Sequence, residues 1–122
     1  MKSEKTTAFI SYLDQRTASV QEDIRRLIAD NRRDEADFEK IRANIFQIVK
    51  TIFQASERMS QEESERVRFL SSRLALFQET WEASLMKAKE HGEDLKIVKE
   101  QTRLEALAEI QDQFRRTWEV TA

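Results

Sequence analysis

The chain of 122 residues contains no proline and a single glycine, Gly92. Helix interiors exclude both residue types, whereas proteins built from strands usually need them in their turns. The rest of the composition points the same way, because glutamate, glutamine, arginine, lysine, alanine and leucine are good helix formers and are abundant here. The sequence therefore predicts an all-α protein with few and short connections, as a single helical domain over residues 1–122.

Three short segments are expected to interrupt the helices, near residues 31, 60 and 91. At the first, Asn31 can adopt the left-handed conformation that closes a helix, and Asp34 can cap the next one. At the second, Ser60 and Glu63 have the spacing of a capping box. At the third, Gly92 is well suited to follow a helix C-terminus. The breaks leave four segments of about 26–30 residues, the pattern of an antiparallel four-helix bundle.

An alternative architecture is a long helical hairpin that completes a bundle by dimerisation. Apolar positions alternate by three and four residues straight through the first expected break, as in a coiled coil, with Asn31 and Asp34 as a polar layer. Residues 3–59 would then form one helix, and only the loss of apolar residues over 30–37 favours a turn. The positions in this alternation are Ile10, Leu13, Thr17, Val20, Ile24, Leu27, Asn31, Asp34, Phe38, Ile41, Ile45, Ile48, Ile52, Ala55 and Met59.

The segment 43–56 is unusually apolar, with Lys50 as its one charged residue in a chain that is 36% charged. At about 100° per residue, the apolar positions from 38 to 59 cover roughly 180° of the helix, too wide for the seam of a two-stranded coiled coil. The opposite face is polar but nearly uncharged, which predicts that it is partly covered too. This segment is therefore expected to contact at least two neighbours.

Surplus apolar surface on the second and third segments predicts an oligomer. The third segment has a second stripe beside its main one, whereas the stripes of the first and fourth segments are narrow, and a lone bundle is expected to have similar widths throughout. The alternative is that a helix with three neighbouring helices inside one chain buries this extra apolar surface within the monomer. The candidate contacts of a partner interface are Phe46, Val49, Phe53, Phe69 and Leu76.

Residues suited to catalysis or metal binding are sparse. The chain has no cysteine, and its one histidine, His91, lies in an expected turn. We therefore expect no catalytic residue, no metal and no cofactor, and we expect that the protein is not an enzyme. The pairs Glu79–Glu82 and Glu90–Glu93 leave one alternative open, a small all-α enzyme with a Mg²⁺ site of the Glu-x-x-Glu type.

Charge and hydropathy favour no nucleic-acid or membrane partner. The net charge is −2, and the arginine pairs at 25–26, 32–33 and 115–116 are interleaved with acids rather than gathered into a basic face. No apolar run approaches the roughly 18 residues of a membrane span, and the first residues lack the pattern of a secretory signal. We expect a cytoplasmic location, with binding of an amphipathic helix to lipid as a further alternative.

Taken together, these features predict a small non-enzymatic helical protein that acts by protein–protein interaction. A homodimer is the expected assembly, and an unknown protein partner is also compatible with the apolar surplus. Burial of apolar helix faces would supply the affinity, and arginine and glutamate at the rim would supply the specificity.

Overall fold

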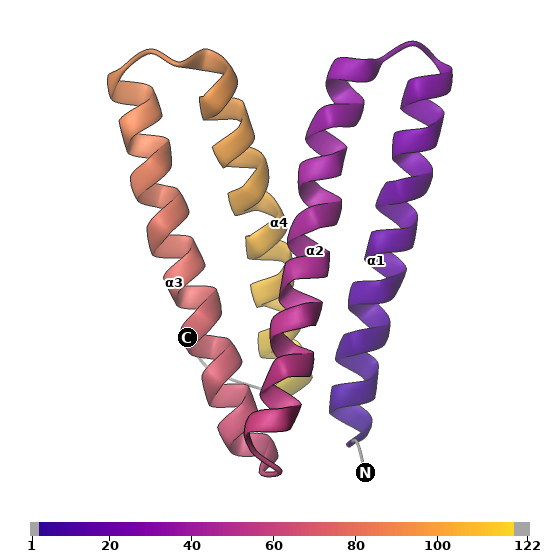
Figure 1. Cartoon of the computed structure of the whole chain (residues 1–122), viewed down its shortest axis with the longest axis vertical. Helices are drawn as coiled ribbons and strands as arrows, with labels where there is room; N and C mark the ends of the chain where they lie inside the picture. Colours follow the sequence, from indigo (N-terminus) through magenta and orange to yellow (C-terminus); the bar gives the residue numbers. More distant parts are fainter. Residues whose placement is uncertain (1–2, 119–122) are drawn as a thin grey trace.

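The computed structural model describes residues 3–118, which form four packed α-helices (Figure 1). They are α1 (Glu4–Ala29), α2 (Arg33–Met59), α3 (Glu63–Glu90) and α4 (Asp94–Trp118). The all-α four-helix architecture is confirmed, and the breaks lie at 30–32, 60–62 and 91–93. In this chain α1 and α2 are two helices, so the single long helix over 3–59 is not what the monomer adopts.

The turn between α1 and α2 closes through the left-handed conformation of Asn31. Its φ is 60°, its N–H donates to the carbonyl of Ile28 at 3.0 Å, and the N–H of Arg32 donates to the carbonyl of Leu27 at 2.8 Å. This pair of bonds is a Schellman motif, which satisfies carbonyls at the end of a helix. The role predicted for Asn31 is confirmed.

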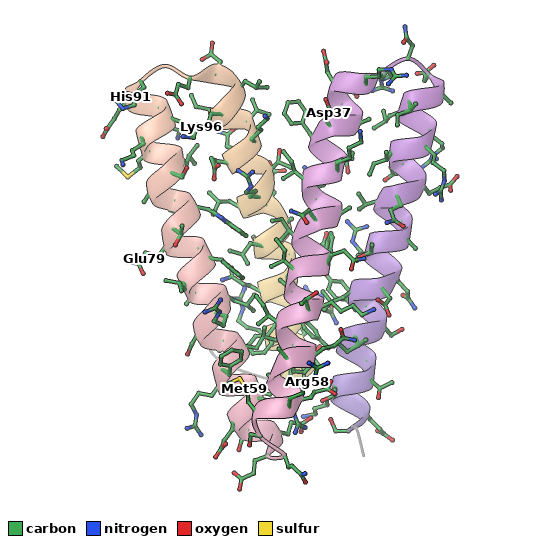
Figure 2. The ribbon with its side chains drawn as sticks, in the orientation of Figure 1. Asp37, Arg58, Met59, Glu79, His91 and Lys96 are labelled. Carbon is green, nitrogen blue, oxygen red and sulfur yellow. The ribbon has the colours of Figure 1, made fainter. Side chains whose placement is uncertain are left out.

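The turn between α3 and α4 has the same hydrogen-bond pattern but is built around glycine. Gly92 has a φ of 63°, its N–H donates to Lys89 at 3.2 Å, and the N–H of Glu93 donates to Ala88 at 3.0 Å. Glycine adopts a positive φ without steric cost, so the prediction for Gly92 is confirmed. Figure 2 shows Asp37 and His91 at the same end of the molecule, because both hairpin turns lie there.

The predicted helix starts are corrected in two places. The residue before α2 is Arg32, which makes no side-chain capping bond, and Asp34 lies inside the first turn instead of capping it. The α3 helix begins at Glu63 itself, so Ser60 and Glu63 do not form a capping box. The carboxylate of Glu63 instead accepts hydrogen bonds from Ser3 and Thr6 at the start of α1.

A single apolar core joins the four helices. The core contains an aromatic group, in which the ring of Phe9 contacts those of Phe53, Phe114 and Trp118 at centroid distances of 5.6, 6.1 and 5.3 Å. The buried members of the core are Phe9, Leu13, Val20, Ala43, Ile45, Phe46, Val49, Phe53, Leu70, Leu74, Ala106, Leu107, Ile110 and Phe114.

The core occupies one end of the bundle. Its buried members lie in residues 4–21, 43–59, 63–76 and 103–118, which we call the closed end. The open end, residues 22–29, 33–42, 77–90 and 94–102, leads to the two hairpin turns. Figure 1 shows the two hairpins diverging toward those turns. At the open end Phe77 and Trp81 still pack against the core, whereas Met86, Leu95 and Val98 are exposed.

Candidate interaction surface

Three of the predicted contact residues, all on α2, are buried inside the chain. Phe46, Val49 and Phe53 are 1%, 0% and 0% exposed and belong to the core. The expectation that they face a partner is corrected, since their own chain already covers them. The physical reason is the position of α2, which packs against α1, α3 and α4 and so uses its wide apolar face within the monomer.

The two predicted contact residues on α3 lie closer to solvent. Phe69 is half-buried, and Leu76 is 48% exposed. They are seven residues apart, about two turns, so they share one side of α3. Both retain surface that a partner could contact, and their role in an interface stays a prediction.

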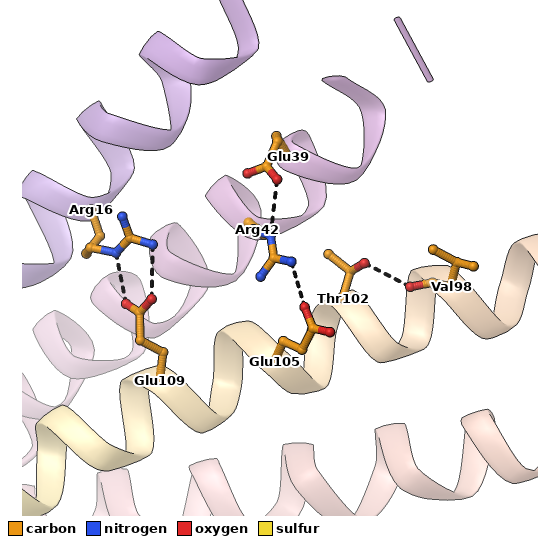
Figure 3. A network of polar contacts seen from close by, with 7 residues as sticks. All are labelled: Arg16, Glu39, Arg42, Val98, Thr102, Glu105 and Glu109. Carbon is orange, nitrogen blue, oxygen red and sulfur yellow. Dashed lines mark hydrogen bonds and ion pairs between the residues drawn. The ribbon is translucent and has the colours of Figure 1, made fainter. Parts of the chain in front are cut away.

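One face of α4 ties the two hairpins together through carboxylates (Figure 3). Glu109 accepts from Arg16 of α1 in a fork, with 2.9 Å from Nε to Oε2 and 3.0 Å from Nη2 to Oε1. Tyr12 donates its hydroxyl to the same carboxylate. One turn earlier, Glu105 accepts from Nη2 of Arg42 on α2 at 2.6 Å. This face of α4 therefore points toward both helices of the first hairpin.

The ionisation of these groups follows from their contacts. Partial burial raises the pKa of the Glu109 carboxyl, but the hydrogen bonds from Arg16 and Tyr12 outweigh it and hold that pKa below its usual range. Burial, followed by the bond to Glu109, raises the pKa of the Tyr12 phenol above its usual range. The Arg16 guanidinium also lies 5.2 Å from the ring centroid of Phe46. The cluster is thus an ion-pair clasp at the rim of the core.

The same face of α4 becomes apolar toward the open end. Thr102 and Val98 lie seven residues before Glu109 and Glu105, and Leu95 lies seven before Thr102, so each is about two turns further along the face. Thr102 is buried, and its hydroxyl donates to the carbonyl of Val98 at 2.8 Å (Figure 3). Val98 and Leu95 are 40% and 62% exposed. These two side chains extend the hairpin-facing surface beyond the core.

On α2, too, an apolar face extends from the core into the open end. Phe38 and Ile41 lie seven residues before Ile45 and Ile48 and so share their side of α2. Ile45 is buried in the core and Ile48 packs against it, whereas Phe38 and Ile41 are half-buried and outside it. We call Phe38, Ile41, Leu95 and Val98 the open-end patch.

One buried acid also lies in the open end. Glu100 of α4 is 5% exposed, and its Oε1 accepts from Arg103 one turn away. Its Oε2 has no hydrogen-bond partner among the residues that the structure describes. A buried carboxylate oxygen without a hydrogen-bond donor is energetically costly. The buried part of the open end therefore contains a polar atom whose hydrogen-bonding capacity is not used within the described residues.

The residues considered for chemistry lie on the surface. His91 is exposed at the second hairpin turn, and Glu79, Glu82, Glu90 and Glu93 are exposed as well (Figure 2 shows Glu79 and His91). Within residues 3–118, no three or more histidine or acidic side chains are grouped so that they could hold a metal ion. None of the helices over that same range is both long and apolar enough to cross a membrane.

The sequence pattern did not single out Leu95 and Val98, because they lie off the main apolar stripe of α4. A signal was present in the seven-residue spacing that links them to Thr102 and Glu105. That signal becomes interpretable only once Glu105 and Glu109 are known to face the first hairpin.

Comparison of the chain with protein-family models, with curated proteins and with solved structures gave no match.

Proposed function

We propose that this chain is a non-enzymatic helical protein that acts by protein–protein interaction, with a second copy of itself as the partner and the open-end patch as the contact surface. The observation that carries the proposal is the exposure of Leu95 and Val98, at 62% and 40%, on a helix face whose continuation, through Glu105 and Glu109, is ion-paired to the first hairpin. Apolar side chains that continue a core into solvent are typical of an interface.

The open-end patch is favoured over the flank of α3 for a structural reason. Leu76 is an exposed leucine whose stripe neighbour, Phe69, is already half-buried, and single exposed apolar residues are common on protein surfaces. The open-end patch instead draws on two hairpins and adjoins the core, so its burial would extend a packed interior. Leu76 is kept as the competing surface in the test.

The test is the solution mass of the chain, by light scattering after size exclusion, over a tenfold range of concentration. We expect a dimer for the native sequence and dissociation at least about tenfold easier for Val98→Glu, because a buried carboxylate without a partner is strongly unfavourable. Gln101→Glu is the matched control, since it adds the same charge to an exposed position of α4.

Two outcomes would contradict this proposal. A monomer at every concentration would remove self-association altogether. A dimer that Val98→Glu leaves intact but Leu76→Glu dissociates would move the interface to the flank of α3, which is the surface that the sequence pattern favours.

A further inference from the structure

The first hairpin turn interrupts a heptad spacing that continues through it. The alternation of three and four residues that runs along α1 passes from Leu27 through Asn31 and Asp34 to Phe38 and continues along α2. The turn segment 30–32 contains neither glycine nor proline. Residues 4–59 can therefore form one continuous helix about 84 Å long, with an apolar seam that Asn31 and Asp34 interrupt as a polar layer.

Opening the turn into helix would gain backbone hydrogen bonds. The first N–H groups of α2 have no acceptor within that helix, and Arg32 before it provides no side-chain cap. In a continuous helix these N–H groups would bond to the carbonyls of residues 29–31. The two turn bonds, from Asn31 to Ile28 and from Arg32 to Leu27, would be replaced by ordinary helical bonds, from Asn31 to Leu27 and from Arg32 to Ile28.

The ion pairs on either side of the turn would survive the change. They join residues three apart in the chain, a spacing that a continuous helix preserves: Arg25–Glu22, Arg26–Asp23, Arg32–Glu35 and Lys40–Asp37. Arg32 also lies 3.8 Å from Asp30 across the turn itself, a distance and exposure at which an ion pair contributes little. The polar contacts near the turn therefore do little to hold it closed.

The second turn differs in the residue that adopts the left-handed conformation, which is Gly92 instead of Asn31. Gly92 favours the left-handed conformation and disfavours helix, so it promotes the turn in both respects. Asn31 tolerates the left-handed conformation but is a β-carbon-bearing residue that can also continue a helix. The sequence therefore favours a turn over helix between α3 and α4, whereas between α1 and α2 it is compatible with either a turn or a continuous helix.

We propose that the first turn is a hinge through which two copies exchange α1. In the exchanged dimer α1 and α2 form one helix, and α1 packs against α2 and α4 of the second copy with the contacts that it makes in the monomer. Exchange of an identical element retains nearly all native contacts and is a low-cost route to a dimer. The inference rests on the self-association proposed above and names its mechanism.

The exchange also accounts for the exposed apolar residues of the open end. Two continuous helices that cross near residue 31 bring the open ends of the two copies together, end to end. Ile28, which is 37% exposed one residue before the end of α1, lies at that crossing, and the open-end patch lies beside it. Asn31 and Asp34 then form a polar layer at the two-fold axis, a position where a polar residue in a seam fixes register.

Substitutions of Asn31 test the hinge in both directions. Asn31→Ala disfavours the left-handed turn and favours helix, and Asn31→Gly does the reverse. We expect the dissociation constants of the two variants, from light scattering across concentrations, to differ by more than about a hundredfold, with Asn31→Ala the tighter dimer. Asn44→Ala is the matched control, because Asn44 is exposed within α2 and its replacement should leave the dissociation constant unchanged.

A cross-link between α1 and α2 detects the exchange directly. Lys50 Nζ lies 2.7 Å from Asp14 Oδ1, so the two positions face each other across the first hairpin. The chain has no cysteine, and Asp14→Cys and Lys50→Cys therefore each introduce a unique thiol. Chains that carry one substitution each are unfolded, mixed, refolded together and treated with a short bismaleimide, and a chain that carries both serves as the control.

A link between the two singly substituted chains in the dimer fraction is the expected result, with the doubly substituted monomer linking only within itself. A dimer in which no such link forms, and whose stability is indifferent to Asn31, would overturn the exchange and leave the proposed self-association intact. A monomer in every variant would overturn both proposals.

Discussion

The two hairpins are built to nearly the same plan but differ in how completely they bury their apolar residues. Each has two long helices and a Schellman turn. The first hairpin supplies Phe9, Phe46 and Phe53 to the core, all at most 1% exposed, whereas the second leaves Leu76, Met86, Leu95 and Val98 at least 40% exposed. Equal local structure therefore does not imply equal packing, because burial depends on how extensively each helix face is covered by its neighbours.

The extent of packing within each hairpin differs. The helices α2 and α4 each pack against all three others, but α1 and α2 contact each other more extensively than α3 and α4 do. The wide apolar face of α2 is mostly used inside the chain, whereas Leu76 of α3 and Leu95 and Val98 of α4 stay exposed. Substitutions in the two hairpins test this difference.

Phe53→Ala and Leu76→Ala compare the two hairpins most directly. Phe53 is fully buried, so its loss leaves a cavity and should lower the free energy of unfolding by about 3–5 kcal/mol. Leu76 is 48% exposed, and its truncation should change that free energy by less than about 1 kcal/mol. Urea denaturation of both variants measures the difference, and similar losses would mean that Leu76 is covered in solution.

Gly92→Ala tests how strongly the second turn depends on its glycine. A β-carbon there would meet no atom within 4 Å, so the cost comes from the positive φ alone and should be about 1 kcal/mol. The matched change in the first turn, Asn31→Gly, should raise the stability of the monomer slightly. Thermal unfolding at a concentration where the chain is monomeric checks both, and a neutral Gly92→Ala would show that the backbone relaxes.

Glu109→Gln tests the clasp between the hairpins. The change weakens the fork to Arg16 and the bond from Tyr12, and it should cost about 0.5–1 kcal/mol, since both partners of the ion pair are more than a third exposed and solvent screens them. Asp112→Asn is the control, because the pair of Asp112 with Arg116 is more exposed and joins residues of one helix. Equal effects of the two substitutions in urea would show that the clasp adds nothing to the cohesion of the hairpins.

The smallest expected effect is the pH dependence of stability in acid. The carboxyls of Glu109 and Glu63 have lowered pKa values, the first through Arg16 and Tyr12 and the second chiefly through Ser3. A lowered folded-state pKa contributes stability that is complete above the unfolded value of about 4.3 and is lost as the pH falls through the folded value. Unfolding free energies below pH 5 should therefore decline less steeply in Glu109→Gln, and an unchanged slope would contradict the assignment for Glu109.

The sequence was sufficient to predict the helices and turns but not the surfaces. Missing proline, a single glycine and the left-handed tendency of Asn31 act locally, and local rules placed all three breaks. The exposure of Phe46 depends instead on which helices surround α2, which no periodicity reveals. The interpretation of Glu63 as part of a capping box failed for the same reason, because its actual partners, Ser3 and Thr6, lie about sixty residues away in the chain.

Because the shared core lies at the closed end, a change in the angle between the two hairpins would have its largest effect at the hairpin turns. The two hairpins are joined at residues 60–62, the ion pairs of Glu105 and Glu109 connect them part-way along their length, and the hairpin turns lie at the far end. Over a helix length of about 40 Å, a rotation of roughly 10° at the closed end displaces a hairpin turn by about 7 Å. A change of packing around Phe53 that rotated one hairpin by this angle would therefore change the separation of the two turns by about 7 Å.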